Sequence, residues 1–378
     1  MKKLASIFLL FLFGIWNSVW AQYYKLDSLI QVAMEDTQTV GLSLAVIKNN
    51  QLHYIKTYGY KNLETKEKLD PEDMFRIASI SKSFTATAIM QFVDTKKINL
   101  SDDISDLMGF RIRNPKYPEQ VITLKMLLSH TSSINDKEGY FTLEAIHPNY
   151  NPNWANAYND YAPGSTYQYC NLNFNILGTL LEKLSGERFD NYIPQQILKP
   201  LGISGGYRVD ALDPTKLVTL YEYNSSTKSY KPAEAAYAKR AEEIKNYKLG
   251  WSTPIFSPTG GMKITAKDLA LYMKMHMNYG KSNGIRIISK KSSKLMQTPV
   301  SLPDYYGLAL QETRKLIPGI TLVGHTGSAY GLFSTMFFNP KKGYGIVLIT
   351  NGTNGGYDQG YNKILKQGFE LVYQEILK

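Results

Sequence analysis

The sequence predicts an α+β fold in which strands from both ends of the chain form one antiparallel sheet flanked by helices, with a mainly helical subdomain inserted between them. Short runs rich in β-branched and aromatic residues occur near the N-terminus and again in the last third, whereas the middle shows helical periodicity and long loops. With 378 residues, 43% of them hydrophobic, the chain can bury a sizeable core. We expect the sheet part at about 22–100 and 255–378, and the helical part at about 101–254.

The first 21 residues have the composition of a secretory signal peptide. Lys2 and Lys3 precede an apolar run that ends at Trp16, and small or modest side chains lead up to Ala21. The run is short for a membrane span, which needs about 20 apolar residues, and no later stretch is long and apolar enough to form one. We therefore expect cleavage after Ala21, export to the periplasm or the medium, and no stable membrane span in the mature protein.

The N-terminal part is expected to contain a helix, a hairpin and a second helix. The first helix covers residues 26–36. The runs 40–50 and 51–62 are typical of strands and meet at Asn49-Asn50, which is a turn signal. From residue 80 to 96 an amphipathic helix is predicted, because apolar side chains recur every three or four positions, at Phe84, Ala88, Ile89, Phe92 and Val93.

The middle and the C-terminal third provide the remaining elements. Helices are expected over Thr123–Ser129, Phe174–Leu184 with Gly186 as its stop, and Thr265–Asn278, and residues 221–232 are expected to form a polar loop. Four short strands and a closing helix should follow, at residues 305–311, 319–325, 332–338, 344–350 and 361–377.

The composition argues against several classes of function. The single cysteine, Cys170, excludes an intramolecular disulfide and a thiolate metal site. The five histidines show no pair at ligand spacing, so we expect neither a metal nor another cofactor. The formal charge is +11, but the basic residues are scattered along the chain, which predicts no nucleic-acid partner.

Ser79 and Lys82, at the start of a predicted helix, are candidates for a nucleophile and its base. Residues at this spacing share one face of a helix, and a desolvated, neutral lysine can take the proton of a serine hydroxyl. Taken alone, the pattern also fits an N-capping serine beside a solvated lysine. It occurs again at Ser225 and Lys228 without an apolar helix behind it, and there we interpret it as solvated surface.

Two further motifs contain groups suited to proton transfer and substrate binding. Tyr169-Cys170-Asn171 offers a phenol that a nearby ammonium can activate and an amide that can orient a lysine or a carbonyl. His325-Thr326-Gly327 lies on a predicted strand, whose edge can supply a backbone N–H to an oxyanion hole. Taken alone, Tyr169 also fits a packed aromatic residue, and His325 also fits a structural histidine.

In this order, the three motifs resemble those of the serine β-lactamase and penicillin-binding-protein superfamily. The similarity is greatest to the class C β-lactamase-related branch of esterases, D-aminopeptidases and D-Ala-D-Ala carboxypeptidase-like enzymes. The resemblance implies the β-lactamase/transpeptidase-like fold. The similar segments extend over nearly the whole mature chain, at residues 71–90, 122–133, 163–186 and 324–352.

The resemblance also implies a role for each motif residue. Ser79 would be acylated, and Lys82 and Tyr169 would share the acid–base work, although it leaves open which of them is the general base. Asn171 would orient Lys82 and the acyl side chain. The oxyanion hole would consist of the backbone N–H groups of Ser79 and Ser328, and the strand segment facing the substrate would comprise His325, Thr326, Gly327 and Ser328.

The sequence departs from the family pattern at three places. His325 stands where a lysine is common, and a neutral histidine suits a substrate carboxylate less well than a fixed ammonium does. Cys170 replaces a serine of similar size, a change that catalysis should survive. The segment 130–133 lacks the usual glycine, and we expect its first residue, His130, to bond the loop backbone.

We therefore predict an exported serine hydrolase that forms an acyl-enzyme at Ser79 with a small ester, an amide or a short peptide, including D-amino-acid peptides. Three alternatives stay open at this point. The acyl group could pass to an alcohol or an amine, as in an acyltransferase. The protein could be a β-lactamase or a penicillin-binding D-Ala-D-Ala carboxypeptidase. It could also be a non-catalytic peptidoglycan-binding or sensor module.

Overall fold

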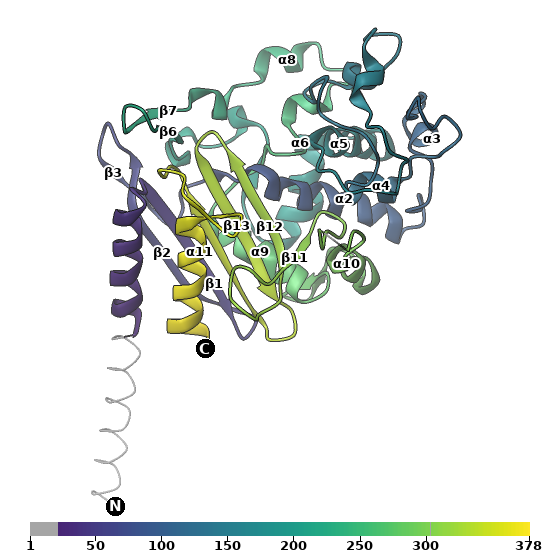
Figure 1. Cartoon of the computed structure of the whole chain (residues 1–378). Helices are drawn as coiled ribbons and strands as arrows, with labels where there is room; N and C mark the ends of the chain where they lie inside the picture. Colours follow the sequence, from purple (N-terminus) through teal and green to yellow (C-terminus); the bar gives the residue numbers. More distant parts are fainter. Residues whose placement is uncertain (1–21, 303) are drawn as a thin grey trace, which may run out of the picture.

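The computed structural model describes residues 22–302 and 304–378, so the predicted signal peptide lies outside the described residues. At its centre is a seven-stranded sheet with the strand order β11-β12-β13-β14-β1-β2-β3 (Figure 1). Neighbouring strands are antiparallel, and β1 pairs with β14, so the two ends of the chain form one sheet as predicted. The strands are β1 (Gly41–Lys48), β2 (Gln51–Asn62), β3 (Glu67–Lys68), β11 (Gln311–Thr313), β12 (Leu322–Ala329), β13 (Leu332–Asn339) and β14 (Tyr344–Thr350).

Helices cover both faces of this sheet (Figure 1). Alternate residues of β1 divide between the two cores, with Leu44 and Val46 on one side and Ala45 and Ile47 on the other. The first core is covered by the helix over residues 22–36 and by α11 (Lys363–Val372), which continues as a π-type turn over Tyr373–Leu377; the second is covered by α2 (Ser81–Asp94) and α9 (Ala266–Met277).

The inserted part packs against the sheet part through α2, which lies against α5 (Asn171–Ser185). Gly186 ends α5 in a left-handed conformation with φ 70°, as its position in the sequence predicted. The other helices are α3 (Ile104–Met108), α4 (Leu124–Leu128), α6 (Phe189–Ile193), α7 (Lys199–Leu201), α8 (Ala241–Lys245) and α10 (Lys290–Gln297).

A second, small sheet of order β4-β8-β5 connects the two parts of the chain. Its central strand, β8, pairs with β4 on one side and with β5 on the other. Because β4 immediately precedes Ser79 in sequence, this sheet anchors the segment that carries the predicted nucleophile. The strands are β4 (Phe75–Arg76), β5 (Gly205–Gly206) and β8 (Lys263–Ile264); the remaining short strands are β6 (Tyr221–Asn224), β7 (Ser229–Pro232), β9 (Lys281–Ser282), β10 (Ile285–Arg286), β15 (Tyr357–Asp358) and β16 (Tyr361–Asn362).

The predicted hairpin between residues 40 and 62 is confirmed, and its turn explains the two asparagines. Asn49 and Asn50 both have positive φ, 52° and 58°. Asparagine tolerates this left-handed region better than most residues, and two such residues in sequence give the turn that matches the twist of the strands.

Two sequence predictions are wrong. Residues 221–232 are not a loop but the β6–β7 hairpin, in which Tyr223 pairs with Tyr230. Residues 305–310 do not form a strand, because Tyr305 and Ala309 have positive φ, 51° and 62°, so the chain bends there, and β11 begins only at Gln311. The next predicted strand is shifted, and β12 extends to Ala329.

In the part of the chain that the structure describes, no helix is long and apolar enough to cross a membrane.

Candidate active site

Ser79 lies in a 3₁₀ turn, η1 (Ala78–Ile80), directly before α2. The preceding residue, Ala78, has φ 46°, a conformation that an L-residue with a Cβ adopts at a cost of about 1–3 kcal/mol. Such strain is kept where the surrounding structure enforces it. Here it fixes the direction in which the chain presents Ser79 at the start of the helix.

Strand β12 passes directly against this turn at Gly327. A Cβ at this position would lie 2.2 Å from the Ile77 carbonyl oxygen and 2.4 Å from Ser334 Oγ, so only glycine fits. Ser334 Oγ also donates to the Ile77 carbonyl, at 2.9 Å. The glycine of the third motif therefore permits close approach of the segment that carries Ser79, rather than of a ligand.

Lys82 is fully buried, and its ammonium nitrogen has three neighbours at hydrogen-bond distance. Nζ lies 3.0 Å from Ser79 Oγ, 2.9 Å from Asn171 Oδ1 and 2.9 Å from the Thr259 carbonyl oxygen. The last two are acceptors only. In a neutral lysine the two N–H bonds must point to them, which leaves the lone pair facing the Ser79 hydroxyl.

The surroundings of Lys82 favour this neutral form. Burial lowers the pKa of Lys82 to about 7, although the nearby Asp136 carboxylate acts in the opposite direction. At neutral pH a substantial fraction of Lys82 is therefore unprotonated, which an exposed lysine would not be. A base whose pKa lies close to the working pH is well suited to take the Ser79 proton.

Asp136 holds the amide of Asn171 in place at the start of α5. Its carboxylate accepts from the backbone N–H groups of Asn171 and Leu172, both at 2.9 Å, and from Asn171 Nδ2 at 3.0 Å. Thr259 Oγ1 donates to Asn171 Oδ1 at 2.9 Å, which fixes the same orientation from the other side. Asn171 therefore presents its oxygen, not its nitrogen, to Lys82.

Cys170 is a buried hydrogen-bond donor in this arrangement. Its thiol contacts Asp136 Oδ1 at 3.2 Å. Burial and the Asp136 carboxylate raise the pKa of the Cys170 thiol well above its ordinary value. A thiol held in this way is a poor nucleophile, so the substitution of serine by cysteine leaves Ser79 as the candidate.

Tyr169 lies over the lysine, with its ring centroid 4.8 Å from Lys82 Nζ. Burial raises the pKa of Tyr169 and a hydrogen bond with Ser79 lowers it, and burial has the larger effect. The side chain is still 37% exposed, which limits the size of the rise. Tyr169 thus keeps its proton at neutral pH and is placed to donate it.

His130 is a structural residue that packs against the ring of Tyr169. The two ring centroids are 4.3 Å apart, and His130 Nδ1 accepts the backbone N–H of Cys170 at 3.2 Å. The His130 carbonyl also accepts from the backbone N–H of Gln168 at 2.8 Å. The expected bond to loop backbone is confirmed.

His325 is a neutral, buried residue whose two ring nitrogens are both engaged. Nδ1 lies 2.5 Å from the Thr326 carbonyl, which can only accept, so Nδ1 carries the hydrogen and Nε2 accepts from the Tyr306 hydroxyl at 3.0 Å. Burial lowers the pKa of His325 to about 3, with a further contribution from the Lys82 charge. This end of β12 therefore presents no cation to a substrate.

Thr326 alternates to the other face of β12 and does not join the group around Ser79. It lines a separate cavity with Thr313 and Tyr361. Ser328 follows Gly327 on β12 and is exposed, and its place in the oxyanion hole with Ser79 stays a prediction.

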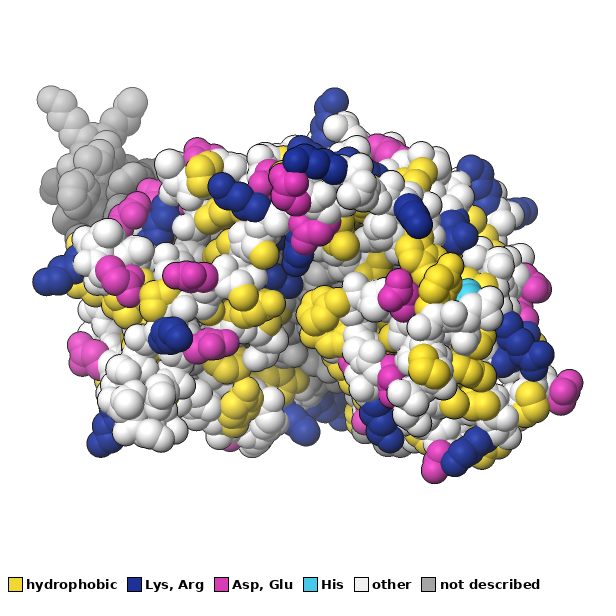
Figure 2. All heavy atoms as spheres, turned by 90° about the horizontal axis from the view of Figure 1, so that it is seen from above, with side chains coloured by type: hydrophobic (Ala, Val, Ile, Leu, Met, Phe, Trp, Pro, Cys, Tyr) yellow, Lys and Arg dark blue, Asp and Glu magenta, His cyan; other side chains and the backbone are white. Residues whose placement is uncertain are grey.

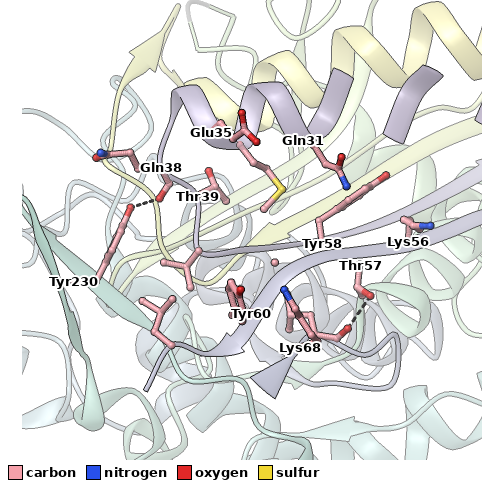
Figure 3. Close-up of a pocket in the computed structure, with 15 residues that line it drawn as sticks. Gln31, Glu35, Gln38, Thr39, Lys56, Thr57, Tyr58, Tyr60, Lys68 and Tyr230 are labelled. Atoms are coloured by element: carbon pink, nitrogen blue, oxygen red, sulfur yellow. Dashed lines mark hydrogen bonds between the residues drawn. The ribbon is translucent and has the colours of Figure 1, made fainter. Parts of the chain in front are cut away.

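A cavity at the opposite edge of the main sheet contains none of the motif residues. It has a volume of about 690 Å³ and lies between the helix over residues 22–36 and strands β2 and β3 (Figure 3). Glu35, Lys56 and Lys68 are among the polar residues that line it (Figure 3). Lys68 Nζ lies 3.7 Å from the centroid of the Tyr60 ring. Because none of the motif residues lines this cavity, it is not the candidate active site.

The sequence matches the beta-lactamase family over residues 26–367. The chain belongs to the beta-lactamase family. This membership agrees with the α+β fold and the large antiparallel sheet described above.

One curated relative in this family is Protein flp of Staphylococcus aureus, 25% identical over 347 residues. The alignment covers 86% of this chain but only 62% of that protein, so the chain spans less than two thirds of the relative.

Similar solved structures include the octameric penicillin-binding protein homologue from Pyrococcus abyssi, with a TM-score of 0.73 and 25% identity, covering 93% of this chain and 77% of that one. D-amino acid amidase from Ochrobactrum anthropi has a TM-score of 0.70 at 20% identity, covering 93% and 99%. EstCE1, a hydrolase with promiscuous acyltransferase activity, has a TM-score of 0.69 at 19% identity, again covering 93% and 99%. At these lower identities the likeness is one of fold.

Within this beta-lactamase-family site, the structure brings Ser79, Lys82 and Asn171 into direct contact and places Tyr169 over them. Three contributing residues were not found from the sequence, namely Asp136, Thr259 and Tyr306. Each acts through contacts with distant segments, and no local pattern marks it. Among the described residues, no group of three His, Cys, Asp or Glu side chains could hold a metal ion.

Proposed function

We propose that this chain is a serine hydrolase that is acylated at Ser79, with neutral Lys82 as the general base. The observation that carries the proposal is the set of contacts of Lys82 Nζ, in which two acceptors hold its N–H bonds and the third neighbour is Ser79 Oγ. A non-catalytic module would have no reason to keep a fully buried lysine in this arrangement, because burying it is costly.

The proposed reaction proceeds in two steps. Ser79 Oγ attacks the substrate carbonyl carbon as its proton moves to Lys82 Nζ, and the backbone N–H groups of Ser79 and Ser328 bind the developing oxyanion. As the bond to the leaving group breaks, Tyr169 gives its proton to the leaving oxygen or nitrogen, and the proton on Lys82 replaces it. Water then attacks the acyl-enzyme, returns the proton to Ser79 Oγ and releases the acid.

We propose small esters and amides, including amides of D-amino acids, as the substrate class. The fold shared with D-amino acid amidase supports this class. The neutral state of His325 also supports it, because β-lactams and D-Ala-D-Ala peptides have a carboxylate that a fixed ammonium would bind better at this position. The site is therefore better suited to substrates without a carboxylate on the leaving-group side.

The test is the intact mass of the purified protein after rapid quenching with p-nitrophenyl acetate, beside the Ser79→Ala variant. We expect an acetyl adduct on the wild type that disappears as acetate is released, and none on the variant. Equal labelling of the variant, or no adduct with any ester or amide of a panel, would contradict the proposal. A parallel sample with benzylpenicillin tests the β-lactam alternative, and added alcohol separates hydrolysis from acyl transfer.

We also propose that the protein is exported and cleaved after Ala21. The support is the composition of residues 1–21 alone. Expression in a bacterium with an intact secretion pathway, followed by N-terminal sequencing of the exported protein, should show Gln22 as the first residue. Retention of the protein in the cytoplasm with Met1 in place would contradict export.

A further inference from the structure

A further cavity, of about 330 Å³, lies beside the segment that carries Ser79. Its walls come from β4, β8, the turn after β12 and the chain before α8. Aromatic and basic side chains dominate the lining, among them Arg76, Tyr207, Arg240, Lys263 and Tyr330. Seen from above, the molecule is hollowed near its centre, and basic side chains lie around the hollow (Figure 2).

Two of the basic residues of this cavity lie opposite each other on paired strands. Arg76 on β4 pairs directly with Lys263 on β8, and Lys263 is 4% exposed. Like charges directly opposite on paired strands are unfavourable. In residues 22–302 and 304–378, every salt bridge involves a cation other than Arg76 and Lys263.

Backbone carbonyls are the partners that the two cations do have. Arg76 Nε donates to Gly260 O and Nη1 to Ala236 O, both at 2.9 Å, and Lys263 Nζ donates to Tyr207 O at 2.6 Å. These bonds hold the groups in place, but a carbonyl oxygen is not a charged partner.

Arg240 adds a third positive charge at the mouth of the cavity. Its guanidinium contacts Glu243 Oε1 at 2.5 Å, but both side chains are more than a third exposed, so the pair is a weak surface one. Its backbone N–H donates to Asp210. Burial, Arg76 and Arg240 lower the pKa of Lys263, and the Asp210 carboxylate acts in the opposite direction, so these groups affect one another electrostatically.

The cavity borders the segments that carry the candidate active site, although none of the motif residues lines it. Arg76 precedes Ser79 by three residues and binds Gly260, the neighbour of Thr259, whose carbonyl holds Lys82. Tyr330 follows Ser328 by two residues, and the Arg76 guanidinium lies 4.9 Å from the centroid of its ring. Tyr169 and His325 mark the other end, where their ring centroids are 6.3 Å apart.

The position of the proton donor assigns the two ends of the site. Tyr169 protonates the leaving group in the proposed reaction, so the leaving group lies at the Tyr169–His325 end of β12. The part of the substrate that stays on Ser79 must then extend toward the opposite end, where Tyr330 and Arg76 lie. The basic residues of the cavity therefore lie on the side of the acyl group.

We propose that this cavity binds a carboxylate at the far end of the substrate's acyl group, through Arg240, Lys263 and Arg76. The inference deepens the proposed function and rests on it for the assignment of the acyl end. A carboxylate would give Arg76 and Lys263 the ion-pair partner that they lack among the described residues, and the aromatic walls suit an apolar linker between it and the reacting carbonyl. The substrates would be half-esters or half-amides of dicarboxylic acids, or amino-acid derivatives with an acidic side chain.

The test compares two esters with the same leaving group and the same chain length, p-nitrophenyl pentanoate and p-nitrophenyl hydrogen glutarate. We expect the wild type to have the higher kcat/KM for the glutarate ester. Arg240→Gln and Lys263→Met should each lower the ratio of the two kcat/KM values about tenfold, chiefly through a higher KM for the glutarate ester. Lys239→Gln, an exposed neighbour that does not line the cavity, is the matched control and should leave the ratio unchanged.

A parallel fall for both esters at an unchanged ratio would show that these residues serve only the structure, and would overturn the inference. So would equal turnover of the two esters by the wild type. If the wild type hydrolyses neither ester, the proposed function fails. Titration calorimetry of Ser79→Ala with glutarate and with pentanoate then tests, independently of turnover, whether the cavity binds a carboxylate. If Ser79→Ala binds glutarate but not pentanoate, and the double variant Ser79→Ala/Arg240→Gln does not bind glutarate, the anion site is supported. If Ser79→Ala does not bind glutarate, the inference is overturned.

Discussion

The chain contains the pattern Ser-x-x-Lys twice, and the two copies differ in almost every physical respect. Ser79 and Lys82 lie at the start of α2, with the lysine fully buried and held by Asn171 and Thr259. Ser225 and Lys228 lie at the tip of the β6–β7 hairpin, both exposed, with Lys228 at φ 50°. Because the spacing is the same in both copies, the spacing alone does not make a serine and a lysine a nucleophile and its base.

The difference lies in desolvation and in the fixed acceptors around the amine. Water stabilises an exposed ammonium, whereas the interior around Lys82 does not, which is why burial lowers the pKa of Lys82 to about 7. The acceptors then direct the lone pair of the neutral amine to Ser79. A four-residue motif becomes a candidate nucleophile and base only when a helix start, a buried environment and distant partners coincide.

The largest expected difference between the two copies concerns the serines. Ser79→Ala should lower kcat/KM for p-nitrophenyl acetate by at least about 10⁴-fold, because no other group can form the acyl-enzyme. Ser225→Ala should leave it unchanged. Steady-state kinetics of both variants at equal concentration measure this. Similar effects of the two substitutions would contradict the claim that only the buried copy is catalytic.

The lysines should differ almost as much. Lys82→Met removes the base while keeping the volume of the side chain, and should lower kcat/KM about 10³-fold. Lys228→Met should have no effect on kcat/KM. Thermal unfolding should also show that Lys82→Met is folded, because a buried amine is exchanged for an apolar group. Full activity of Lys82→Met would show that another group takes the serine proton.

Tyr169→Phe should have an effect that depends on the leaving group. Turnover of an amide, whose nitrogen must be protonated, should fall about 10²-fold. The loss for a p-nitrophenyl ester should be less than about tenfold, because that leaving group departs as an anion. Equal losses for the two substrates would assign Tyr169 a role in positioning rather than in proton donation.

Asp136→Asn should have the smallest effect and should change the pH dependence. The Asp136 carboxylate raises the pKa of Lys82, so its removal should lower that pKa and move the rising limb of kcat/KM to lower pH. Loss of the carboxylate at the start of α5 should also cost about 1 kcal/mol of stability. The pH profile of kcat/KM and urea unfolding measure the two effects. A rising limb that moves to higher pH would contradict the statement that Asp136 raises the pKa of Lys82.

Much of this fold could be predicted from periodicity, because apolar residues recur at helical spacing in α2, α5 and α9, although these helices are buried on nearly all sides, and the strands of the sheet alternate or are continuously apolar. The β6–β7 hairpin was missed because its polar turn conceals the pairing of Tyr223 with Tyr230. The expected strand at 305–311 failed because its apolar run gives no sign of the bend at Ala309. In the site, Ser79, Lys82, Tyr169 and Asn171 belong to ordered motifs. Asp136 and Thr259 do not, since their roles depend on tertiary contacts alone.

The central claim is that neutral Lys82 takes the proton of Ser79, and the most direct test is the pH dependence of kcat/KM for p-nitrophenyl acetate in the wild type and in Tyr169→Phe. Activity should rise with pH as Lys82 loses its proton, so we expect a rising limb with an apparent pKa of about 7 in both proteins. A limb near the ordinary pKa of lysine, or one that disappears in Tyr169→Phe, would contradict the account and identify Tyr169 as the base.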